Sequence, residues 1–206
     1  MKYLDFKEEF FDLACFNLNQ IYAWQPDFDR KNLTRWLKKG YILRLKQAYY
    51  TFSEYLSKPD FELYFANKMY SPSYISLQSA LAFYGMIPES VVQITSVSSR
   101  KTSSFINQMG EFSYKTIKAD FFFGYKLKSI SDDKTVKIAT PEKALLDLFY
   151  LYPFYNSEQE ILNLRIDEDF LKNDFNYGLL EEYRQKMNIL ALDDRLNKFR
   201  EAYKFI

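Results

Sequence analysis

The feature that most constrains the fold is a short segment near the amino terminus in which apolar and basic residues recur at the period of a helix. At 3.6 residues per turn, Leu33 and Trp36 fall on one side, and basic and polar residues fall on the other. Asp27 or Asp29 is positioned to cap the start of this helix, and Gly40 follows its end, where a left-handed residue is common. The segment therefore predicts a helix with one core-facing side and one basic side.

Two β-prone runs, residues 41–45 and 49–52, follow the glycine directly. The connection between them, residues 46–48, is short and contains no glycine. Because two β-prone runs joined this closely are typical of a hairpin, we predict that they pair as an antiparallel ribbon.

The residues before this segment predict two supporting helices. Within residues 4–13, apolar side chains recur at positions i, i+4 and i+7, which gives one apolar face. Asn17 followed by Gln20 resembles a capping box that opens a second short helix. The order of helix, helix, turn, helix and ribbon predicts a winged helix-turn-helix within residues 1–56.

The charge of this region predicts contact with phosphates. Residues 30–53 contain seven Lys or Arg and no Asp or Glu, although the whole chain has a formal net charge of +1. If the basic helix enters the major groove of double-stranded DNA, Arg35 is the side chain best suited to a bidentate contact with guanine. The predicted DNA-binding residues are Lys31, Asn32, Thr34, Arg35, Lys38, Lys39, Arg44, Lys46 and Gln47.

Two other interpretations of this region remain open from the sequence. The basic side of the helix can be a solvated surface that binds no ligand. The rings of Trp36, Tyr49 and Tyr50 can stack on bases, although their positions in the pattern favour a place in the core.

The composition indicates a globular protein with a core built from rings. The chain has 20 Phe and 18 Tyr but only 5 Gly, so aromatic packing is expected and glycine-rich phosphate loops are not. The single cysteine, Cys15, excludes an intrachain disulfide and is expected in the core. The longest apolar run, residues 144–154, is interrupted by Asp147 and is too short to span a bilayer. We therefore expect a cytoplasmic protein without a membrane segment.

The remainder of the chain predicts a second, mixed α+β domain over residues 60–206. A polar cluster with a proline places a linker near residues 54–60. Threonine, proline and glutamate at 140–142 form a strong helix start. We predict helices over residues 61–69, 75–84, 141–151, 158–164, 179–187 and 195–205, and strands over residues 91–98, 112–118, 121–130 and 136–139.

Most kinds of enzyme site are excluded by composition. The chain has no histidine, so it can form neither a Ser-His nor a Cys-His nucleophile, and the common glycine-rich nucleotide loops are missing. Asp132 and Asp133 are the obvious carboxylate pair for a magnesium ion, but their polar neighbours favour an exposed turn. We expect no catalytic activity, no metal and no cofactor.

Two stretches of the second domain are more specific than their periodicity. Residues 70–88 read YSPSYISLQSALAFYGMIP, and residues 138–148 read IATPEKALLDL. The first resembles the start of the antitoxin domain in the AbiEi family of type IV toxin-antitoxin systems, and the second is similar to the same family's other characteristic stretch. The predicted winged helix lies where the family has one, so the resemblance extends over nearly the whole chain.

This resemblance implies a bacterial protein with two activities. The amino-terminal domain is expected to repress its own operon by binding an inverted repeat in the promoter, with two copies of a monomer or weak dimer on the operator. The second domain is expected to neutralise an adjacent nucleotidyltransferase-like toxin without the need for a stable complex.

The sequence departs from the family pattern at two places, and one alternative function remains. The predicted wing tip at residues 46–48 lacks the usual glycine, and Tyr84 stands where histidine is frequent. The alternative is a winged-helix regulator without a toxin, in which the second domain senses a ligand or dimerises. Ser73 and Ser76 are interpreted as helix caps, and Glu142, Lys143 and Asp147 as parts of a helix start and its faces.

Overall fold

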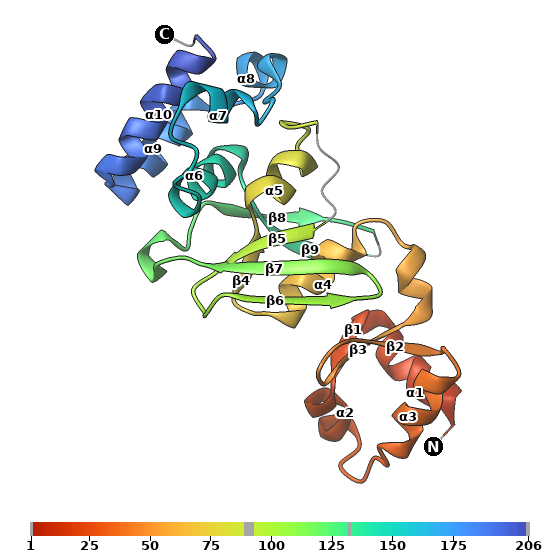
Figure 1. The fold of residues 1–206 in the computed structure, drawn as a ribbon. Coiled ribbons are helices and arrows are strands. Elements are labelled where there is room, and N and C mark those ends of the chain that lie inside the picture. Colours follow the sequence, from red (N-terminus) through yellow and green to blue (C-terminus); the bar gives the residue numbers. More distant parts are fainter. Residues whose placement is uncertain (1, 89–92, 132, 205–206) are drawn as a thin grey trace.

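The computed structural model describes residues 2–88, 93–131 and 133–204 (Figure 1). The predicted strand positions 91 and 92, Asp132 of the acidic pair and Phe205 of the last predicted helix lie outside these residues. The fold is mixed α+β with a helical carboxy-terminal part, as the sequence predicts.

The amino-terminal part combines short helices with a small sheet. Its helices are α1 (Tyr3–Phe10), a 3-10 helix (Phe11–Leu13), α2 (Leu18–Trp24) and α3 (Lys31–Lys38). Its antiparallel sheet has the strand order β1 (Cys15–Asn17), β3 (Tyr49–Phe52) and β2 (Ile42–Lys46). The predicted hairpin is therefore confirmed, whereas β1 was not predicted, because a three-residue strand has no periodicity to detect.

Local hydrogen bonds explain where these helices begin and end. The predicted capping box is present: Asn17 accepts from the backbone of Gln20, whose side chain accepts from the Asn17 amide. Asp29, one of the two predicted caps, accepts from the Lys31 amide at 2.9 Å at the start of α3. Gly40 has φ +69° and ends that helix as predicted.

Aromatic rings form the core of this part. The Phe6 ring stacks on Phe10 with centroids 4.8 Å apart and lies 4.6 Å from Trp36. Trp36 is only 2% exposed, and Tyr50 and Cys15 are also buried. These residues are therefore core residues, and Trp36 is excluded as a platform for bases.

The segment predicted as a linker is folded. Residues Ser53–Ser57 form a 3-10 helix in which Tyr55 is 1% exposed. The Tyr55 hydroxyl donates to the Phe11 carbonyl at 2.7 Å, and its ring lies 4.7 Å from Phe61. The connection is exposed at most of its positions, but Tyr55 anchors it to both parts of the chain through packed rings.

The second part is built on a mixed sheet that has six strands in the described residues. Their order is β6 (Ser103–Asn107), β7 (Gly110–Thr116), β5 (Gln93–Ser98), β4 (Ser73–Ile75), β9 (Thr135–Ala139) and β8 (Tyr125–Ser129). The β5–β7 and β4–β9 pairs are parallel, and the other pairs are antiparallel. Helix α4 (Phe61–Met69) packs on one face, and α5 (Leu77–Phe83) and α6 (Pro141–Leu151) pack on the other (Figure 1).

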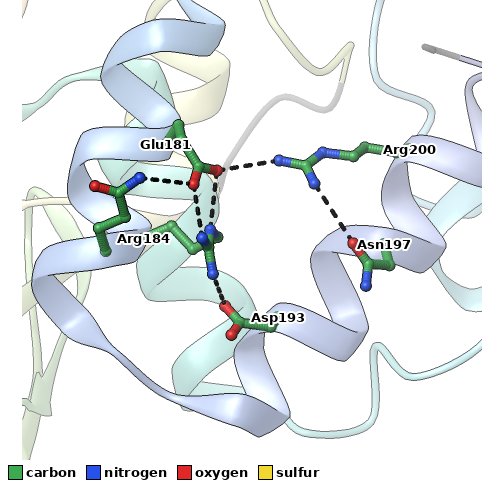
Figure 2. Close-up of polar contacts among 6 residues, drawn as sticks. Glu181, Arg184, Asp193, Asn197 and Arg200 are labelled. Atoms are coloured by element: carbon green, nitrogen blue, oxygen red, sulfur yellow. Dashed lines mark hydrogen bonds and ion pairs between the residues drawn. The ribbon is translucent and has the colours of Figure 1, made fainter.

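A layer of short helices completes this part on the side of α6 (Figure 1). It contains α7 (Glu158–Leu162), α8 (Glu168–Asn173), α9 (Tyr177–Met187) and α10 (Leu190–Ala202). Figure 2 shows that α9 and α10 are joined by a polar cluster, in which Arg184 bonds to Glu181 at 2.6 Å and to Asp193 at 2.8 Å. Arg200 of α10 bonds to the same glutamate at 3.3 Å.

Several predicted elements differ from those observed. Strands β4 and β6 were not predicted because their serines have weak strand preference, and the predicted helix over 75–84 begins only at Leu77. The predicted strand over 121–130 begins only at Tyr125, because Gly124 has φ +74° and breaks the extended backbone. Helix α8 was also missed. The helix over 141–151 was predicted with its correct ends, and Thr140 caps it.

Candidate nucleic-acid interface

Helix α3 has the two-sided character that the sequence predicts. Leu33 and Trp36 are buried, whereas Lys31, Thr34 and Arg35 are exposed. Lys38 and Lys39 at its end are exposed as well. Among the described residues, no carboxylate forms an ion pair with these basic side chains, so their charge faces solvent.

Arg35 is held in place by its own helix. Its Nη2 donates to Asn32 Oδ1 at 2.7 Å, one turn earlier. This bond restricts the guanidinium group and leaves its other N–H donors for a ligand. Asn32, predicted as a DNA contact, is therefore also a positioning residue for Arg35.

A cleft of about 250 Å³ lies between α3 and the β-ribbon. It is lined by Arg30, Leu33, Thr34, Leu37, Arg44 and Tyr50. Two arginines and two hydroxyl-bearing residues, Thr34 and Tyr50, thus line a cleft whose lining contains no acid, and this composition suits a phosphate. Arg30 was not among the predicted contacts; its position immediately before the helix was the available signal.

Lys46 departs from the prediction. Its Nζ donates to the Met69 carbonyl at 3.4 Å and lies 4.8 Å from the Tyr70 ring and 5.0 Å from the Phe105 ring. Burial lowers the pKa of Lys46, and the positive charge of Arg100 lowers it further. Lys46 therefore belongs to the contact with the second part of the chain and is removed from the predicted DNA-binding set.

A β-bulge explains why the Arg44 and Lys46 side chains lie in different surroundings. The register of β2 against β3 shifts between these two residues. Strict alternation would put both on one face of the ribbon, and an additional residue breaks this alternation. Arg44 remains exposed beside α3, while Gln47 is exposed in the turn as predicted.

The ribbon is also fixed by the neighbouring sheet. Asn107 at the end of β6 donates from Nδ2 to the Leu45 carbonyl at 2.8 Å. In addition, the Tyr64 hydroxyl of α4 donates to the Leu13 carbonyl at 3.2 Å. The orientation of the basic surface therefore depends on contacts with the second part.

The two stretches singled out in the sequence meet in a buried polar cluster. From the first stretch, Tyr74 and Ser76 donate to Asp147 Oδ2 at 2.9 and 2.8 Å. From the second, Lys143 forms an ion pair with Asp147 and donates to the Tyr74 hydroxyl at 3.0 Å. Both charged side chains are 0% exposed. The prediction that Ser76 caps a helix is wrong in its chemistry, because its hydroxyl bonds to Asp147 and makes no cap.

This cluster consists of Tyr74, Ser76, Lys143 and Asp147, and its buried polar groups satisfy one another's hydrogen bonds. Burial raises the pKa of Tyr74 well above its usual value, and the Asp147 carboxylate raises it further, so the phenol stays protonated and donates. Each charge has a partner of opposite sign at hydrogen-bond distance, as buried charges require. The cluster therefore links β4 to α6 inside the second part of the chain.

A larger cavity, of about 520 Å³, lies at the start of α6. It is lined by Tyr84, Lys126, Lys128, Thr140, Pro141, Glu142, Phe170, Asp174, Asn176 and Leu179. The buried Glu142 accepts from the Asn176 amide at 2.9 Å. Burial raises the pKa of Tyr84 to about 12, with a further contribution from Glu142. The lining mixes both charge signs and contains no nucleophile paired with a base.

Similarity to known proteins, metal-binding groups and membrane-spanning helices were each considered for this chain. No known protein-family model matches this chain, and no curated protein matches it. Within the part of the chain that the structure describes, no group of acidic or cysteine side chains is arranged to hold a metal ion. No described helix has the length and apolar character needed to cross a membrane.

Proposed function

We propose that this chain binds double-stranded DNA through α3 and the β-ribbon, and that residues 1–56 act as a winged helix-turn-helix. The observation that carries this proposal is the exposed basic side of α3 beside a cleft in which Arg30 and Arg44 meet without an acid. A helix with this charge suits the major groove, and the adjacent cleft suits one backbone phosphate.

The contacts divide into those that read sequence and those that add affinity. Arg35, restrained by Asn32, is the side chain for a bidentate contact with guanine. Arg30, Lys31, Lys38, Lys39 and Arg44 are the phosphate contacts, so affinity should fall with salt at a log-log slope of about −4 to −5.

We further propose that the chain is an antitoxin of the AbiEi type that represses its own operon. The resemblance of residues 70–88 and 138–148 to this family supports the proposal. The fold adds support because both stretches contribute to the Tyr74–Ser76–Lys143–Asp147 cluster and hence to one structural unit. The partner is then an adjacent nucleotidyltransferase-like toxin.

One observation favours the alternative of a regulator whose second domain senses a small molecule. The cavity of about 520 Å³ is in the size range of ligand sites, and it carries charges of both signs. Such a regulator would use the same DNA-binding surface, so the two functions differ only in what the second domain recognises.

The DNA-binding proposal is tested by titrating a duplex of the gene's own promoter, and a scrambled duplex, with purified protein. In the double variant Lys31→Ala/Arg35→Ala, loss of one base contact and one phosphate contact should weaken specific binding at least about tenfold. The matched control, Lys118→Ala/Lys126→Ala, removes two exposed lysines elsewhere and should bind like the wild type. Equal promoter affinity in both variants would exclude α3 as the recognition helix.

A further inference from the structure

A small cavity with an unusual lining lies on the other face of the second sheet, beneath α4. Its volume is about 200 Å³, and it is lined by Asn67, Lys68, Ser71, Ser73, Leu127, Thr135 and Lys137. These residues come from the end of α4, the segment after it and strands β4, β8 and β9. The cavity is therefore separate from both the DNA-binding surface and the cavity at the start of α6.

Two polar atoms buried in the lining of this cavity have no hydrogen-bond partner. Ser73 is 2% exposed, and its Oγ is unpaired. The Asn67 Oδ1 accepts from the Lys137 amide at 2.6 Å, which fixes the amide orientation and leaves Nδ2 as an unpaired donor. Because unpaired buried polar groups are costly and rare, these two indicate a missing partner that accepts hydrogen bonds.

The charge of the lining indicates what that partner is. Lys68 and Lys137 both line the cavity, and no acidic residue does. In the described residues, neither lysine forms an ion pair; their ammonium groups lie 5.2 Å from the Tyr64 ring and 5.7 Å from the Tyr125 ring. Uncompensated cations beside unpaired donors suit an anion.

We propose that this cavity binds a phosphate group, as inorganic phosphate or as the phosphate of a nucleotide. Asn67 Nδ2 and Ser73 Oγ donate to its oxygens, and the Lys68 and Lys137 ammonium groups neutralise its charge. The hydroxyl of Thr135 is a further donor in the lining. A tetrahedral oxyanion presents acceptors in several directions at once, which matches donors that come from one helix and two strands better than a planar carboxylate does.

The site is tested in the full-length protein without DNA, so its failure leaves the DNA-binding proposal untouched. The Asn67 side-chain amide is followed by ¹⁵N NMR during titration with inorganic phosphate, and its signals are assigned from their loss in Asn67→Asp. Its two signals should shift saturably with phosphate and stay unchanged with chloride at equal ionic strength. A parallel titration with adenosine monophosphate distinguishes free phosphate from a nucleotide by the lower dissociation constant.

Matched variants separate this site from general basic attraction. Ser73→Ala and Lys68→Ala/Lys137→Ala should each weaken binding roughly tenfold or more. Ser96→Ala removes another unpaired buried hydroxyl outside the cavity lining, and Lys101→Ala/Lys118→Ala removes equal charge from exposed positions outside it. Both should bind like the wild type. Absence of a saturable Asn67 shift, or equal affinity in Ser73→Ala and Ser96→Ala, would overturn the proposal.

Discussion

At the scale of single residues, Lys143 shows how the core of the second part of the chain accommodates a charge. Its ammonium group reaches Asp147 and Tyr74, and its methylene stem passes close to the backbone at Gly124. A Cβ added at Gly124 would lie 2.8 Å from Lys143 Cγ. The glycine therefore provides both a positive φ and the space for a lysine whose far end is fixed.

Gly124→Ala should accordingly destabilise the fold more than a glycine replacement in open space. Left-handed strain costs about 1 kcal/mol and overpacking against Lys143 adds about 1–3 kcal/mol, so we expect a loss of roughly 2–4 kcal/mol in the free energy of unfolding. The control is Gly85→Ala, because Gly85 has the same φ of +74° and no atom within 4 Å of the added Cβ. Chemical denaturation measures both, and equal losses would show that Lys143 moves aside freely.

At the scale of elements, α9 and α10 are joined by charges as well as by apolar contacts. Arg184 and Gln185 donate to Glu181, and Arg200 reaches the same carboxylate from α10 (Figure 2). These hydrogen bonds, with Arg184 contributing most, lower the pKa of Glu181 to about 2. The ionised carboxylate is thus favoured in the folded state.

The sign of the resulting pH dependence follows from this lowered pKa. The stabilisation by Glu181 is present above its unfolded pKa of about 4.3 and is lost as the pH falls toward 2. Glu181→Gln should therefore lower stability at pH 7, by less than about 1 kcal/mol because the group is partly exposed, and the difference should vanish near pH 2. Urea denaturation across this range measures it, with exposed Glu182→Gln as the control. A difference independent of pH would point to packing instead of charge.

At the scale of the whole molecule, hydrogen bonds join the ribbon that carries part of the basic surface to the second part of the chain. Lys46 donates to the Met69 carbonyl at the end of α4, and Asn107 of β6 donates to the Leu45 carbonyl of the ribbon. These two hydrogen bonds hold the ribbon against α4 and β6. We propose DNA binding by α3 and the ribbon, and we assign toxin neutralisation to the second part of the chain. A variant that loses one should retain the other.

This separation gives a growth experiment. The reading frame adjacent to the gene is expressed alone, with the full chain, and with the Lys31→Ala/Arg35→Ala variant. Growth should stop with the adjacent frame alone and return with either form of this protein, because the proposal assigns neutralisation to the second part of the chain and not to α3. A harmless neighbour, or no rescue by the wild type, would favour the regulator with a ligand-sensing second domain.

An element can be predicted from the sequence when the interactions that form it lie within a few residues of one another. Helix α3, the capping box at Asn17 and the helix that begins after Thr140 were predicted because their periodicity, caps and breakers lie within a few residues. Strand β4 was not predicted, because three residues of mixed character become a strand only when β5 and β9 pair with them.

The same distinction applies to the sites. The sequence by itself determined the basic side of α3, since a helix of 3.6 residues per turn separates it from Leu33 and Trp36 without any other contact. Only the tertiary structure decided that Lys46 leaves this surface, that Arg30 joins it, and that Ser76 bonds to Asp147. The physical reason is that a bulge, a cleft between elements and a buried ion pair each depend on residues far apart in the chain, whose distances are set by packing and not by sequence spacing.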